Sequence, residues 1–126
     1  DGYWSNVWNN DAKGWCACYW GGRPAETMMF SAAYVAESKW NDTMCKTTDS
    51  AVKFNQLVKD ARKELDESKK RDILYECQRL IYDDGGLLCP LFNSYVSANS
   101  KKIAHGKIAA NWDSDGAKCV ERWWFA

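Results

Sequence analysis

The sequence predicts an α+β fold in which a helix pair packs on a small mixed sheet. Two consecutive segments, 49–65 and 66–84, carry apolar residues at helical spacing. Two shorter runs, 15–20 and 87–92, are continuously apolar, which is typical of buried strands. The helices and strands do not alternate regularly along the chain, and this favours α+β over a doubly wound sheet.

The N-terminal part is expected to start with one or two helical turns at 2–8, where four apolar residues share a face: Tyr3, Trp4, Val7 and Trp8. Residues 9–14 are polar and turn-like. The apolar run at 15–20 (WCACYW) predicts a buried strand that stops at Gly21-Gly22. Pro24 suits the first turn of a short helix that continues to Tyr34.

The helix pair follows an irregular stretch at 36–48. Asp49 or Ser50 is expected to cap the first helix, and Asp66 or Ser68 the second. Gly85-Gly86 ends the second helix. The apolar positions are Phe54, Leu57, Val58, Ala61 and Leu65 in the first helix, and Ile73, Leu74, Cys77, Leu80 and Ile81 in the second. The short connection predicts an antiparallel pair.

The C-terminal part is expected to be mostly strand. Residues 87–92 form the first strand, and Pro90 within it argues against pairing on both sides. Further strands are expected at 95–98, at 107–111 and in the tail, 120–126.

Length and charge exclude several function classes. The chain has 126 residues, enough for a single domain with a real core. Seventeen basic and seventeen acidic residues give no net charge, so no broad attraction to nucleic acid is expected. No apolar run reaches the ~20 residues that span a bilayer, and no secretory leader is visible. The chain begins at Asp1 without an initiator methionine, and it is therefore expected to be a processed, trimmed or excised piece.

Catalysis has little support, and neither an enzyme nor a cofactor is expected. The single histidine, His105, lies in the polar segment AHGK and is interpreted as a surface turn residue. The sequence contains no nucleophile elbow, no zinc-protease motif and no phosphate-binding glycine loop. Asp83 and Asp84 are interpreted as a solvated helix end, because adjacent residues on a helix do not face each other.

The six cysteines leave three interpretations open. Cys16 and Cys18 would share one face of a strand and form a thiolate metal site with Cys45, Cys119 or His105. Structural zinc sites usually show CxxC-like pairs, however, and none is present. The cysteines are otherwise small buried residues, or form disulfides if the compartment is oxidising.

The best candidate for a binding site is the segment Tyr19-Trp20-Gly21-Gly22-Arg23-Pro24, at the expected end of a buried strand. Its glycines permit close backbone approach to a ligand, and Trp20 offers a stacking wall. Arg23 offers a planar fork suited to a carboxylate or phosphate. The alternative is a structural turn in which Arg23 makes a surface ion pair.

An ordered set of motifs gives the chain a family resemblance. One motif is the spacing of nine residues in the helix pair and the segment after it: Glu64, Asp66, Arg71, Tyr75, Gln78, Ile81, Asp84, Pro90 and Phe92. The flanking motifs are GYWSNVW, YWGGRP, Trp40-Asn41-Asp42-Thr43 and ERWWFA. Together these motifs cover residues 2–126. They resemble the C-terminal part of the family 5 extracellular solute-binding proteins, the peptide- and oligopeptide-type binding components of bacterial ABC importers.

The resemblance implies a periplasmic-binding-protein-like type II clamshell that binds a solute and delivers it to a membrane permease without catalysis. It implies a periplasmic location and a small-molecule or peptide-like ligand. The chain would correspond to part of one lobe, with the N-terminal lobe absent. The expected ligand-binding residues are Tyr19, Trp20, Gly21, Gly22, Arg23 and Trp40.

Two departures from the family qualify these expectations. Dipeptide-binding relatives carry an acid in the loop that matches 21–24, where this chain has Arg23. A small anionic solute therefore suits the loop better than a free amine. Six cysteines are also more than the family usually carries. The alternative function is an orphan fragment that self-associates as a structural or interaction domain, because a severed lobe exposes aromatic and strand-edge surface.

Overall fold

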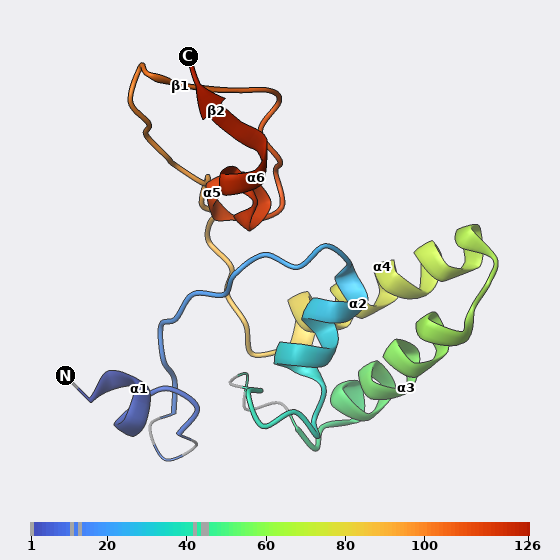
Figure 1. Cartoon of the computed structure of the whole chain (residues 1–126). Coiled ribbons are helices and arrows are strands. Elements are labelled where there is room, and N and C mark those ends of the chain that lie inside the picture. The colour runs from blue at the N-terminus through green and yellow to red at the C-terminus, as the bar shows by residue number, and fades with distance from the viewer. Residues whose placement is uncertain (1, 11, 13, 42, 44–45) are drawn as a thin grey trace. The chain divides into compact units, whose positions relative to one another are not determined.

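The computed structural model describes residues 2–10, 12, 14–41, 43 and 46–126 (Figure 1). The chain divides into two compact units. We call Asp1–Trp20 with Ala25–Leu88 the helical unit, and Gly21–Pro24 with Cys89–Ala126 the C-terminal unit. The helix pair lies in the first and a two-stranded antiparallel sheet in the second, which confirms the α+β class.

The helical unit contains five helical elements among its described residues. They are α1 (Tyr3–Asn6), α2 (Glu26–Met29), the π-helix η2 (Phe30–Tyr34), α3 (Asp49–Lys63) and α4 (Glu67–Asp84). The expected helical turns at the N-terminus and the expected helix after Pro24 are therefore confirmed. No helix among the described residues is both long enough and apolar enough to cross a membrane.

Local capping interactions explain where the helix pair begins and ends. The Thr48 side chain accepts a hydrogen bond from Ala51 N at 3.1 Å, so the cap of α3 lies just before the two expected candidates. Asp66 caps α4 as expected, accepting from the backbone N–H groups of Ser68 and Lys69. Gly86 has φ +64°, a conformation that glycine adopts without strain, and the chain leaves α4 there.

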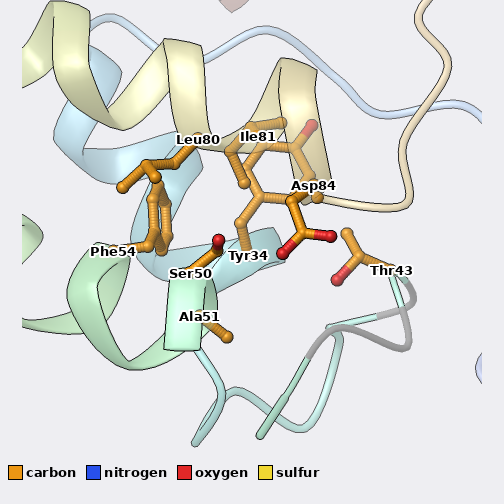
Figure 2. A pocket seen from close by; sticks show the side chains of 9 residues that line it. Tyr34, Thr43, Ser50, Ala51, Phe54, Leu80, Ile81 and Asp84 are labelled. Carbon is orange, nitrogen blue, oxygen red and sulfur yellow. The ribbon is translucent and has the colours of Figure 1, made fainter. Parts of the chain in front are cut away.

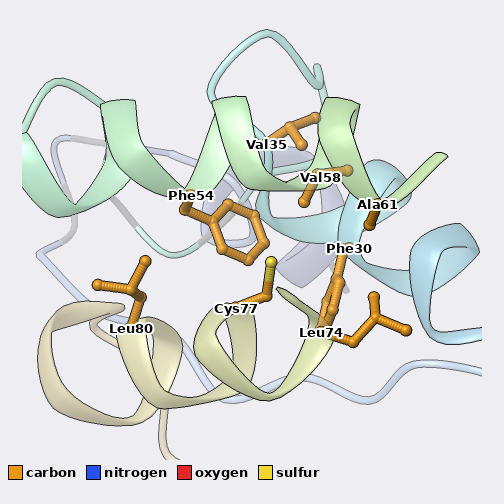
Figure 3. Close-up of a cluster of buried hydrophobic side chains, with 8 residues drawn as sticks. All are labelled: Phe30, Val35, Phe54, Val58, Ala61, Leu74, Cys77 and Leu80. Atoms are coloured by element: carbon orange, nitrogen blue, oxygen red, sulfur yellow. The ribbon is translucent and has the colours of Figure 1, made fainter. Parts of the chain in front are cut away.

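The core of the helical unit lies between α3, α4 and η2 (Figure 3). Its buried residues are Phe30, Val35, Phe54, Val58, Ala61, Leu74, Cys77 and Leu80. The rings of Phe30 and Phe54 meet edge to face with centroids 5.5 Å apart. The apolar stripes predicted for both helices are thus confirmed, except that Leu65 lies beyond the end of α3 and is exposed.

A buried asparagine organises the irregular segment after η2. Asn41 Nδ2 donates to the carbonyl oxygens of Tyr34 and Val35, each at 3.2 Å. Its Oδ1 accepts from the backbone N–H and the hydroxyl of Thr43. Because Asn41 is buried, these bonds satisfy groups that water does not reach, and they fix the chain beside Trp40.

Four predicted strands are wrong. Residues 15–20, 87–92, 95–98 and 107–111 belong to no strand, and most of their side chains are exposed. A continuously apolar run becomes a buried strand only where a neighbouring strand pairs with its backbone. Among the described residues the only ladder joins β1 (Ile103–His105) to β2 (Trp123–Phe125), so these four segments have no sheet to join.

The C-terminal unit is built around that ladder. The register pairs Ile103 with Phe125 and His105 with Trp123. The predicted tail strand is confirmed for β2, which follows the short helix α6 (Cys119–Arg122). His105 lies in β1 rather than in a loop, and its ring packs against Trp123 at 5.1 Å between centroids.

The segment before α6 makes a left-handed turn. In α5 (Asp113–Ala117) the φ angles of Ser114, Asp115, Gly116 and Ala117 are all positive. Such a turn costs roughly 1–2 kcal/mol for each non-glycine residue. The buried Asp115 carboxylate opposes this cost: Oδ1 accepts from Ala109 N at 2.6 Å and Oδ2 from Trp123 Nε1 at 3.0 Å.

Candidate functional site

Five aromatic side chains of the helical unit form a connected group, which we call the aromatic cluster: Tyr3, Trp4, Trp8, Tyr19 and Trp20. Trp4 meets Tyr19 edge to face with centroids 5.6 Å apart, and Trp8 lies 6.5 Å from Trp20. The aromatic residues on and just after α1 therefore contact two of the six predicted site residues, Tyr19 and Trp20.

The local sequence explains why these rings meet. Trp4 and Trp8 are four residues apart, and their centroids lie 5.7 Å from each other. The Tyr3 hydroxyl donates a hydrogen bond to the carbonyl oxygen of Ala17, which ties α1 to the extended segment that leads to Tyr19. Trp4 and Tyr19 remain exposed, so the cluster presents ring surface to solvent.

Trp40 is connected to the same part of the helical unit. Asn9, which follows Trp8 and has φ +54°, donates from Nδ2 to the carbonyl oxygen of Lys39 at 2.5 Å. The Lys39 ammonium lies 4.5 Å from the centroid of the exposed Trp40 ring. The hydrogen bond thus connects the residue after Trp8 to the residue before Trp40, although the two are far apart in sequence.

The other three predicted site residues, Gly21, Gly22 and Arg23, belong to the C-terminal unit. Arg23 Nη1 donates to the carbonyl oxygens of Gly21 at 2.7 Å and Gly22 at 3.2 Å. Its guanidinium carbon lies 5.9 Å from the ring centroid of Trp112. These contacts support the structural-turn interpretation, because Arg23 braces its own turn.

Two further aromatic residues, Tyr95 and Trp112, lie at this turn, and the sequence does not predict them there. A Cβ added to Gly22 would lie 3.1 Å from Tyr95 Oη, and one added to Gly21 would lie 3.6 Å from Trp112 Cζ3. Gly22 therefore allows Tyr95 to approach the backbone closely, whereas the distance at Gly21 is an ordinary van der Waals contact. No spacing signal connects residues so far apart in sequence, so only the fold reveals the contact.

The helical unit also contains a small hollow beside the core (Figure 2). Its lining residues are Tyr34, Thr43, Ser50, Ala51, Phe54, Leu80, Ile81, Asp84 and Gly85. It has room for about one water molecule. A solute of even dipeptide size does not fit, so this hollow is not the binding site.

The described residues contain no group of three or more His, Cys, Asp and Glu side chains positioned to hold a metal ion. Cys16, Cys77, Cys89 and Cys119 are free thiols, and Cys45 lies outside the described residues. Cys77 is buried, as the small-residue interpretation predicts. Cys18 and Cys89 are exposed, so that interpretation is wrong for them.

The contrast between these thiols gives a testable prediction. Burial, with a smaller contribution from the Glu76 charge, raises the pKa of Cys77 to about 11. At pH 8 only about one Cys77 side chain in 10³ is a thiolate, and the thiolate is the reactive form. In the native protein, iodoacetamide should label Cys89 at least about 100-fold faster than Cys77, as measured by peptide mass spectrometry. Equal native rates would contradict the burial of Cys77.

No protein-family model, curated protein or solved structure matches this chain. The resemblance to the family 5 solute-binding proteins therefore stays a prediction that rests on the residues and spacings of the sequence. The structure shows in which unit each predicted site residue lies. Tyr19, Trp20 and Trp40 belong to the helical unit, and Gly21, Gly22 and Arg23 belong to the C-terminal unit.

Proposed function

We propose that this chain is a ligand-binding part of a bacterial solute-binding protein that serves an ABC importer. It acts by binding peptide-like or small anionic solutes, without catalysis. The observation that carries the proposal is the aromatic cluster, which holds Tyr19 and Trp20 against Trp4 and Trp8 while leaving ring surface exposed. The permease partner and the periplasmic location follow from the family resemblance.

The chemistry of the aromatic cluster supports binding. Trp and Tyr combine a large apolar body with a polar tip, which suits peptide groups and side chains. The rings already pack against one another, so they lose little conformational freedom when a ligand arrives. Trp40, linked to the same segment through Asn9, adds a further exposed ring.

The guanidinium of Arg23 supports the proposal that the bound solute carries an anionic group. A guanidinium recognises carboxylates through parallel hydrogen bonds, and a peptide or an organic acid carries such a group. In the structure Nη1 stabilises its own turn through the carbonyl oxygens of Gly21 and Gly22, so the proposal of an anionic solute rests on the type of side chain and not on these two contacts.

Ligand titration tests the proposal. The protein from the complete reading frame is titrated with di- and tripeptides and with small organic acids, and binding is followed by tryptophan fluorescence and melting temperature. Trp4→Ala should weaken binding about tenfold. Trp124→Ala is the matched control, because Trp124 is 55% exposed and Trp4 53%, but it lies in β2 outside the aromatic cluster.

The control variant should bind with unchanged affinity. If no solute of these two classes changes the fluorescence or the melting temperature of the complete protein, the proposed function is wrong. If Trp4→Ala and Trp124→Ala weaken binding equally, the solute binds but the aromatic cluster is not its site.

A further inference from the structure

Residues 89–98 (CPLFNSYVSA) lie outside helices, strands and turns and are exposed along their whole length. Phe92 and Val96 have 94% and 90% of their surface exposed. No backbone-to-backbone hydrogen bond joins this segment to another described residue. The segment therefore combines apolar side chains in water with a backbone whose polar groups lack backbone partners.

This combination indicates what kind of partner the segment needs. It contains most of the predicted strand 87–92 and all of the predicted strand 95–98, yet the β1–β2 sheet of the same unit includes neither. A flat apolar surface would cover the side chains but would leave the peptide N–H and C=O groups unpaired. Another β-strand pairs with the backbone and also brings apolar side chains alongside, so it covers both features of the segment.

Pro90 makes the two edges of this segment unequal. Along a strand, the N–H and C=O groups of successive residues point to opposite edges. The edge of even-numbered residues includes Pro90, which has no N–H to donate. The other edge carries a full set of donors and acceptors from Cys89, Leu91, Asn93, Tyr95 and Ser97. The segment therefore has one complete pairing edge.

We propose that residues 89–98 pair, antiparallel and edge to edge, with the same residues of a second copy of this chain. A two-fold axis at Asn93 brings all five residues of the complete edge into register, with Leu91 opposite the partner's Tyr95 and Cys89 opposite the partner's Ser97. The segment contains no charged residue, and the chain has no net charge, so the two copies do not repel each other.

The geometry also limits the assembly to two copies. In the pair, both complete edges face inward and both edges that contain Pro90 face outward. A third copy would have to pair with an edge that lacks a donor, which proline disfavours. The contact is therefore a closed dimer rather than an open-ended fibre. It does not depend on any ligand, and so goes beyond the proposed function.

Two neighbouring proline substitutions test this pairing. Asn93→Pro removes a donor from the complete edge, and Ser94→Pro removes one from the edge that Pro90 already interrupts. Both residues are exposed and lie outside helices and strands, so both variants should fold alike. Sedimentation equilibrium is run on the 126-residue chain with reductant present, because Cys89 is exposed.

The wild-type chain should show a reversible monomer–dimer equilibrium. Asn93→Pro should raise its dissociation constant at least about tenfold, and Ser94→Pro should change it less than about twofold. A wild-type chain that stays monomeric at all concentrations, or that forms open-ended aggregates, would overturn the proposal. Equal effects of the two substitutions, or no effect of either, would also overturn it, because pairing through the complete edge requires them to differ.

Discussion

Replacing Phe54 by alanine should lower the free energy of unfolding of the helical unit by about 3–5 kcal/mol. Phe54 is 2% exposed and lies between α3 and α4, where its ring also meets Phe30 edge to face. The substitution removes the ring from the centre of the core and leaves a cavity that the surrounding helices fill only in part. Since small domains are stable by only about 5–15 kcal/mol, the variant should lose a large part of its stability.

Urea unfolding followed by circular dichroism at the helical wavelength measures this loss, because α3 and α4 are the longest helices described. Val52→Ala is the control on the same helix, since Val52 is 61% exposed and lies outside the core. It should change the free energy of unfolding by less than about 0.5 kcal/mol. A Phe54→Ala variant as stable as Val52→Ala would show that the core is not centred between α3 and α4.

The helix pair was predictable because its determinants are local. Apolar residues at helical spacing, the Asp66 cap and the Gly85-Gly86 stop all act within a few residues of the positions they fix. The cap of α3 was missed because three neighbouring residues, Thr48 to Ser50, are all good capping residues. Propensity alone does not choose between them, whereas the geometry of the chain entering the helix does.

The strands were not predictable in the same way, because a strand is defined by its partner. The runs at 15–20 and 87–92 have the composition of buried strands, but no strand among the described residues pairs with them. Conversely, β1 contains His105, which the sequence predicts in a surface turn. Its pairing with β2 depends on residues about twenty positions away, which composition does not reveal.

The candidate site was predictable in part. The aromatic and glycine composition of 19–23 singled out the segment, but not the neighbours of each residue. Tyr19 and Trp20 meet α1 because the Tyr3 hydroxyl bonds to Ala17, a contact between side chain and backbone that has no sequence signature. Trp112 and Tyr95 were missed for the same reason, since long-range contacts in the C-terminal unit bring them to the glycine turn.

Replacing Asp115 by asparagine should loosen the C-terminal unit. The buried carboxylate accepts hydrogen bonds from Ala109 N and Trp123 Nε1 on its two oxygens, and Arg122 Nη1 lies 3.2 Å from Oδ1. An amide has only one oxygen, so one of the two N–H donors would face an NH₂ group and lose its partner. Hydrogen exchange of the Trp123 indole should accelerate at least about tenfold. Asp113→Asn, the same change at an exposed neighbour, should leave it unchanged.

Acidification should weaken the C-terminal unit in the same place. The hydrogen bond from Ala109 N holds the pKa of Asp115 below its usual range; the Trp123 bond and the positive charges of Arg122 and His105 act in the same direction, and burial opposes them. Because the folded pKa lies below the unfolded value of about 3.9, this stabilisation is complete above about pH 5. It is lost as the pH falls through the folded pKa, so exchange of the Trp123 indole should accelerate below about pH 4. The Asp113→Asn variant should show the same acceleration at low pH, and the Asp115→Asn variant should not show it. If exchange of the Trp123 indole in the wild-type protein follows the ordinary pH dependence of an exposed indole down to pH 2, then Asp115 does not stabilise the turn.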